Sequence, residues 1–160
     1  MQLRPLLPLL GPALRNRSRP VAALILAATL AGNAPAGGEV KVTVIGLRSQ
    51  NGQMLACLSP HPKAFPDCSR DPGARRLVVP LNARTAEIDF GPVPAGAYAI
   101  ALIHDENGNN RMDKAAIMPR EGFGFSRDAP VRFGPPSFQR AAFSVTDKPV
   151  HQIIRMRYIL

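Results

Sequence analysis

Short stretches that are apolar, or that alternate apolar and polar residues, recur along the chain after residue 36. In residues 39–47, valines occupy positions 40, 42 and 44, with Lys41 and Thr43 between them. A period of two places successive side chains on opposite faces of a β-strand, so this pattern predicts a half-buried strand. The predicted strands are residues 39–47, 53–59, 76–81, 85–90, 97–103, 139–146 and 150–159.

The stretch 97–103 is apolar on both faces, which indicates a strand in the centre of a sheet. Turn residues separate the stretches. Asn51-Gly52 predicts a hairpin between the first two strands, and the prolines and glycines of residues 91–96 exclude helix. No helix is predicted after residue 36. Regular short strands with abundant turn residues predict an all-β sandwich.

The first 36 residues have the pattern of an export signal. Four arginines precede an apolar run over residues 21–31, and Ala34-Pro35-Ala36 supplies the small residues that a signal peptidase accepts. A membrane-spanning helix needs about 20 apolar residues, and this run is roughly half that. We therefore predict a signal peptide over residues 1–36, with an uncleaved membrane anchor as the alternative. Residues 37–160 are predicted to form one domain without a membrane span, periplasmic or secreted.

The net charge depends on that cleavage. The full chain has 20 basic and 11 acidic residues, a net charge of +9. Residues 1–36 carry four of the basic residues and none of the acidic ones, so 16 basic and 11 acidic residues remain, a net charge of +5. The mature sequence has no basic run interleaved with aromatic residues. We therefore expect no nucleic-acid partner.

Cys57 and Cys68 are the two cysteines of the chain. An exported chain with two cysteines most simply joins them in a disulfide. Closing so short a loop is expected to stabilise the fold by roughly 2–3 kcal/mol. A metal site formed by the cysteines and His61 is the less favoured alternative.

The densest group of potential metal ligands lies between His104 and Asp113. Positions 1, 3, 5 and 9 of a calcium-type loop are Asp105, Asn107, Asn109 and Asp113, and the Arg111 carbonyl lies where a main-chain ligand enters. Asn110 and Ala116 replace the EF-hand glycine and closing glutamate, so we expect a weaker site, with a Kd of about 10⁻⁴–10⁻³ M. Glu121 closes the ligand shell only if the chain folds back. The alternative is a turn in which Asn and Asp side chains bond their own main chain.

Aromatic residues gather in the glycine- and proline-rich segment after the loop. With the histidine before the loop, they predict a recognition surface of His104, Phe123, Phe125, Phe133 and Phe138. The alternative is that the rings cap an open end of the sandwich and that His104 is a hydrogen-bonded histidine at the rim of the core. The sequence contains none of the common hydrolase motifs, so we expect no enzyme.

Several segments resemble a bacterial family catalogued as domain of unknown function 2141. The resemblance rests on residues 65–68, 94–98, 104–113, 119–126 and 132–138, which follow the family's order over nearly all of the mature chain. It implies an exported bacterial protein with one such domain and no established activity. The turn at residues 94–98 is also similar to that of transthyretin-like domains. The expected fold is therefore a single immunoglobulin-like or transthyretin-like antiparallel β-sandwich of about seven strands.

These observations together predict a non-catalytic binding or interaction module that is exported from the cell. Its loop over residues 105–113 is expected to hold calcium weakly and to order the neighbouring aromatic segment. The partner would be another protein or an envelope component. One alternative is a structural envelope protein whose loop is only a turn, and another is a small periplasmic hydrolase that uses His104.

Overall fold

A computed structural model describes residues 37–116 and 118–160 of the chain. The predicted signal peptide, residues 1–36, lies outside the described residues. Within the described part, no helix is both long enough and apolar enough to cross a membrane. The structure is mostly β, with several sheets of mainly antiparallel strands and a short α-helix.

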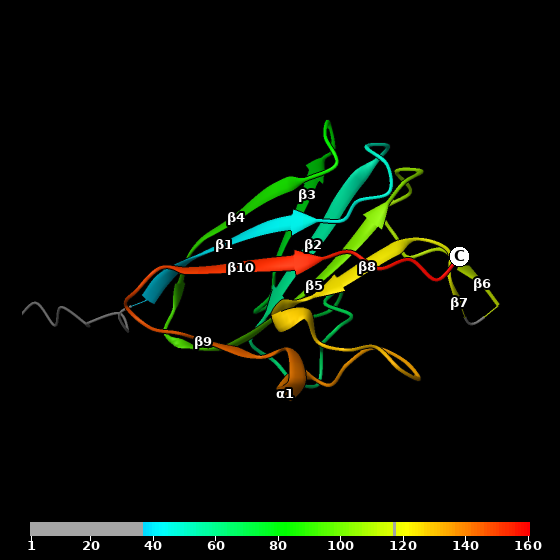
Figure 1. Ribbon diagram of the computed structural model, residues 1–160. Helices are drawn as coiled ribbons and strands as arrows, with labels where there is room; N and C mark the ends of the chain where they lie inside the picture. The colour runs from blue at the N-terminus through cyan, green and yellow to red at the C-terminus, as the bar shows by residue number, and fades with distance from the viewer. Residues whose placement is uncertain (1–36, 117) are drawn as a thin grey trace, which may run out of the picture. The chain divides into compact units, whose positions relative to one another are not determined.

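The first sheet has three strands in the order β10–β1–β4 (Figure 1). They are β1 (Gly37–Ile45), β4 (Ala86–Pro94) and β10 (Val150–Arg155). The β1–β4 pair is antiparallel, whereas β10 runs parallel to β1. The central strand β1 therefore lies between two strands that are far from it in sequence.

The second sheet is built around β5 (Gly96–Asp105), in the order β3–β2–β5–β8. Its other strands are β2 (Gln53–Ser59), β3 (Arg75–Pro80) and β8 (Gly122–Phe125), and β9 (Phe143–Val145) pairs with the start of β5. A small hairpin of β6 (Lys114–Ala115) and β7 (Met118–Pro119) precedes β8. The 3-10 helix η1 (Ser126–Asp128) and the helix α1 (Phe138–Ala141) follow β8.

Residues from both sheets form one hydrophobic core. Alternate side chains of β1 face this core, and Val40, Val42 and Val44 are fully buried, as the alternation predicted. In β5, Ile100 and Leu102 contribute to the same core. The position of β5 within its sheet confirms the prediction of a central strand.

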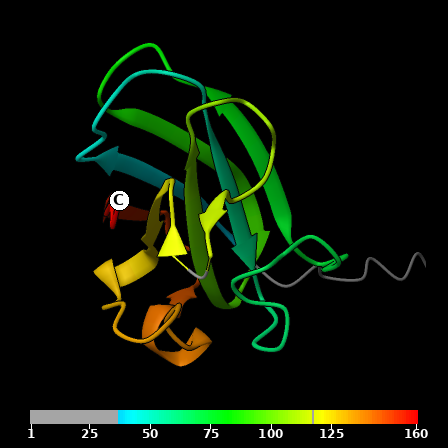
Figure 2. The same ribbon diagram turned by 90° about the vertical axis from the view of Figure 1, so that its right-hand side faces the viewer.

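A second cluster covers the other face of β5 and contains the aromatic rings of the segment after the loop. It includes Phe65, Ala99, Ala101, Phe123, Phe125, Ala129, Phe138 and Ala141. Figure 2 shows α1 beside the loop that joins β2 to β3, and the Phe65 ring from that loop lies 6.0 Å from the Phe138 ring. These two buried faces explain why β5 is apolar throughout.

Glycine alternates with phenylalanine in β8 because one face of this strand leaves no room for a side chain, whereas the other face contributes to the second cluster. A Cβ on Gly122 would lie 2.3 Å from the Tyr158 ring, and one on Gly124 would lie 2.8 Å from Ile154. The segment that follows β10 therefore packs directly against the β8 backbone, while Phe123 and Phe125 point into the second cluster.

Three local predictions were wrong. The Asn51-Gly52 turn does not form a hairpin, because both edges of β1 are occupied and the chain crosses to the second sheet. The predicted strand 139–146 is instead the end of α1 followed by β9. The sheets are also not entirely antiparallel, because β10 is parallel to β1.

Candidate cation site

The candidate cation site lies beyond the end of β5. The strand ends at Asp105, the chain passes through the loop of residues 106–113, and the β6–β7 hairpin returns it to Glu121 before β8. The Arg120 N–H donates to the Asp113 carbonyl at 2.9 Å, which closes the base of this hairpin. Figure 1 shows β6 and β7 beyond the ends of β5 and β8. The fold thus returns Glu121 to the loop.

Asp105 is fully buried and organises the start of the loop. Its carboxylate accepts hydrogen bonds from the N–H groups of Asn109 (3.0 Å) and Asn110 (2.7 Å) and from the Gln53 side-chain amide (2.8 Å). Burial alone would raise the pKa of Asp105, but these hydrogen bonds, with the Gly108 main chain, hold the pKa below its ordinary value. Asp105 is therefore ionised inside the fold.

The Asn51-Gly52 turn also shapes this end of β5. Gly52 has a positive φ of 73°, and a Cβ on it would lie 2.0 Å from the Asp105 carbonyl oxygen. Only glycine lets the two main chains approach so closely. This contact sets the path of the chain as it enters the loop.

Asp113 collects the side chains from the middle of the loop. The amides of Asn107 and Asn109 donate to the same Asp113 oxygen at 2.8 and 3.0 Å. These hydrogen bonds, the one from Asn109 foremost, lower the pKa of Asp113. The exposed Arg111 guanidinium lies 3.4 Å from the other oxygen of Asp113. The structure therefore brings together the predicted side-chain ligands at positions 3, 5 and 9.

The sequence offered Glu121 as a closing ligand only if the chain folds back, and the β6–β7 hairpin does return it to the loop. Glu121 is only 4% exposed, and its Oε2 accepts a hydrogen bond from the Asp113 N–H at 3.0 Å. Oε1 is buried and has no hydrogen-bond partner. Burial foremost, with the negative charges of Asp105 and Asp113, raises the pKa of Glu121, although the N–H groups of Asp113 and Glu106 donate to the carboxylate and act to lower it. A buried carboxylate with an unsatisfied oxygen beside two other carboxylates is the arrangement that a cation would neutralise.

Carboxylates do not complete the site by themselves. Among residues 37–116 and 118–160, no three His, Cys, Asp or Glu side chains are arranged to hold a metal ion. The remaining ligands must be amide and main-chain oxygens. The amide nitrogens of Asn107 and Asn109 face Asp113, so each amide has to rotate to present its oxygen. Exchanging these hydrogen bonds for cation contacts favours weak binding.

His104 is completely buried, so it does not belong to an exposed recognition surface. Its Nε2 lies 2.9 Å from the Asn51 carbonyl, which can only accept, so Nε2 carries a hydrogen. In the neutral ring, Nδ1 then accepts the hydroxyl of Tyr158 at 2.7 Å. Both ring nitrogens are thus bonded within the fold. These bonds describe a structural histidine that joins the end of β5 to the C-terminal segment.

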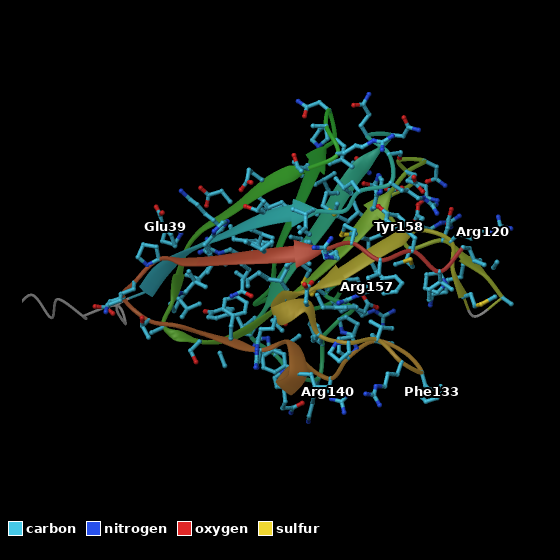
Figure 3. All side chains as sticks on the ribbon, in the orientation of Figure 1. Glu39, Arg120, Phe133, Arg140, Arg157 and Tyr158 are labelled. Atoms are coloured by element: carbon cyan, nitrogen blue, oxygen red, sulfur yellow. A yellow bond between two sulfur atoms is a disulfide. The ribbon has the colours of Figure 1, made fainter. Side chains whose placement is uncertain are left out.

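The other residues of the predicted recognition surface do not lie together on the exterior. Phe123, Phe125 and Phe138 are buried in the second cluster because they fill the space against the outer face of β5. Phe133 alone among these phenylalanines is exposed, and Figure 3 shows it at the tip of its loop. The expectation of a shared aromatic surface is therefore corrected to one exposed ring.

Cys57 and Cys68 form the predicted disulfide, with their Cα atoms 6.3 Å apart. The bond attaches the loop between β2 and β3 to β2. A disulfide of this kind is consistent with export to an oxidising compartment.

A second polar cluster in this loop was not anticipated from the sequence. The buried Asp71 accepts the Ser59 hydroxyl at 2.6 Å and lies 2.7 Å from Nδ1 of His61. The hydrogen bond from Ser59 lowers the pKa of Asp71 despite the burial of its carboxylate. Because Ser59 donates to the carboxylate and not to the imidazole, the arrangement fixes the loop and does not activate a nucleophile.

Comparison with known proteins agrees with the resemblance noted in the sequence. The model of a family described as an uncharacterized protein conserved in bacteria, DUF2141, matches residues 42–153. This range extends from β1 to β10 and includes the whole candidate cation site. No curated protein and no solved structure matches the chain. The chain therefore belongs to the bacterial DUF2141 family.

Proposed function

We propose that this protein is an exported, non-catalytic binding module whose loop after β5 holds a calcium ion. The observation that carries the proposal is the unpartnered oxygen of Glu121, which is buried beside Asp105 and Asp113. An unsatisfied buried polar atom costs about 1–3 kcal/mol, and more when it is charged. A bound cation would remove this penalty by ligating the oxygen.

The ligand set favours a hard cation that accepts many oxygen donors. The proposed ligands are the side chains of Asp105, Asn107, Asn109, Asp113 and Glu121 and the main-chain carbonyl of Arg111, and the three carboxylates would have to draw together on the ion, because no three of them in the described residues are arranged to hold a metal as they stand. Six or more oxygens with no nitrogen or sulfur match the preference of calcium, and a bidentate Glu121 would add a seventh. Three carboxylates, opposed by the positive charges of Arg111 and Lys114 in the same stretch of sequence, agree with a Kd of about 10⁻⁴–10⁻³ M.

The proposal extends to fold type, location and partner. We infer an immunoglobulin-like or transthyretin-like β-sandwich from the two sheets that share one core. The disulfide and the sequence of residues 1–36 support export to the periplasm or the exterior. The partner would be another protein or an envelope component, recognised through the surface that the loop orders.

Thermal unfolding of the purified protein, with about 10 mM calcium and with chelator, tests this proposal. A ligand that binds only the native state stabilises it by RT ln(1 + [L]/Kd), so the expected gain is about 1.4–2.7 kcal/mol for the Kd range above. Asp105→Asn keeps the shape of the side chain but removes its charge, and it should abolish most of that gain. Equal melting temperatures of the wild-type protein in calcium and in chelator would overturn the proposal.

A structural envelope protein is the second candidate function, and a specific observation favours it. Asn107 and Asn109 each accept a main-chain N–H from two residues ahead, at 3.1 and 3.0 Å. These are the bonds of Asx turns, which hold a loop without a metal. In that case calcium would leave the melting temperature unchanged, and Glu121 would be only a buried acid.

A further inference from the structure

The side chain of Arg48, in the turn after β1, reaches three segments that are distant in sequence. Its Nε donates to both oxygens of Glu106, at 3.2 and 3.0 Å, and Nη2 donates to the Arg120 carbonyl at 3.1 Å. Nη1 donates to the main-chain oxygen of Leu160. The guanidinium carbon also lies 4.6 Å from the centre of the Tyr158 ring, within the range of a cation–π contact.

Two of these contacts lie next to proposed calcium ligands. Glu106 directly follows Asp105, and Arg120 directly precedes Glu121. One guanidinium therefore joins the segment that supplies the first ligand to the segment that supplies the last. Figure 3 shows Arg120 and Tyr158 at the same end of the fold. A planar fork can bridge a carboxylate and a carbonyl at fixed angles, whereas an ammonium group cannot.

We propose that Arg48 is a positioning residue for the calcium site, which holds the Asp105 and Glu121 segments beside one another before a cation binds. This inference rests on the proposed function, since it concerns the affinity of the same site. Arg48 does not touch the ion. It lowers the entropy that the two segments lose when their carboxylates converge on a cation.

The sign of the effect separates positioning from simple electrostatics. Arg48 is a positive charge near a cation site, and it also neutralises Glu106. If only charge mattered, replacing Arg48 with glutamine would strengthen calcium binding. If Arg48 acts by holding the two segments in place, the same replacement weakens calcium binding even though it removes a positive charge. Arg48→Lys, which retains the charge but not the fork, should then also weaken binding.

Titration calorimetry with calcium chloride measures the Kd of the wild-type, Arg48→Lys and Arg48→Gln proteins. We expect both variants to raise the Kd about tenfold or more, the size seen when outer partners of metal ligands are removed. Lys114→Gln is the matched control, because Lys114 is exposed, adjoins Asp113 in the sequence and is not among the proposed ligands. This control should lower the Kd about two- to fivefold, as expected for losing one repulsive charge in a solvated site.

A Kd for Arg48→Lys within twofold of the wild-type value, or tighter binding by Arg48→Gln, would overturn the inference. The melting temperature of each variant in chelator separates a general loss of stability from a specific loss of affinity. If neither variant folds, Glu106→Asp, which keeps the negative charge but shortens the side chain that Arg48 bonds, decides by the same criterion. Absence of calcium binding by the wild-type protein would instead reject the proposed function itself.

Discussion

Replacing Glu121 with glutamine should stabilise the protein in the absence of calcium, and calcium should reduce or remove that advantage. Without a cation, the wild-type carboxylate is buried, has an unpartnered oxygen and faces Asp105 and Asp113. A glutamine can keep the hydrogen bond from the Asp113 N–H, and its NH₂ group can donate to the neighbouring carboxylates. We therefore expect Glu121→Gln to raise the free energy of unfolding in chelator by about 1–2 kcal/mol.

In calcium the variant should lose this advantage. The wild-type protein gains about 1.4–2.7 kcal/mol in ~10 mM calcium if its Kd is about 10⁻³–10⁻⁴ M. The variant should gain at least about 1 kcal/mol less, because a neutral amide cannot replace a bidentate carboxylate as a calcium ligand. Thermal unfolding in both conditions measures the two gains, at roughly 4 °C per kcal/mol for a chain of this size.

The pH dependence gives the same prediction an independent check. The pKa of Glu121 is raised in the folded protein, so its contribution to stability is fully present below its ordinary pKa and is lost as the pH rises through the folded value. In chelator, the wild-type protein should therefore fall behind Glu121→Gln as the pH rises from about 4 to 7. At the acidic end, where Glu121 is protonated in both states, the two proteins should converge.

Glu39→Gln is the control for this experiment, because it makes the same chemical change at an exposed carboxylate on β1. Figure 3 shows Glu39 at the opposite end of the fold from Arg120, the neighbour of Glu121. Its effect should stay within about 0.5 kcal/mol in both conditions. The reasoning is refuted if Glu121→Gln is less stable than the wild-type protein in chelator, or if calcium stabilises both equally.

Two further predictions concern the fold. In urea unfolding, Gly122→Ala should lower the free energy of unfolding by about 1–3 kcal/mol, because the new Cβ would lie 2.3 Å from the Tyr158 ring. Gly96→Ala is the control: its Cβ would have its nearest contact at 3.5 Å, so the loss should be less than half as large. Replacing both Cys57 and Cys68 with alanine should cost roughly 2–3 kcal/mol in the same assay, and an unchanged midpoint would show that the disulfide adds no stability.

The sequence by itself determined which residues of β1 face the core and where turns interrupt the strands. Alternation is a local property, and burying Val40, Val42 and Val44 needs no knowledge of the neighbouring strand. The disulfide was also predictable, because two cysteines allow one pairing. The spacing of Asp105 and Asp113 identified the loop as ligand-rich, since a turning chain brings alternate oxygens together.

Only the tertiary structure decided which strands are neighbours and which residues complete the site. The parallel pairing of β1 with β10 joins the two ends of the described chain, and no local pattern encodes a contact at that separation. Phe123 and Phe125 are buried because α1 and the disulfide loop cover the outer face of β5, a cover that the sequence does not reveal. The β6–β7 hairpin brings Glu121 to the loop, and the turn after β1, in the other sheet, brings Arg48. Their roles arise from distances in space, which the fold sets and sequence spacing does not.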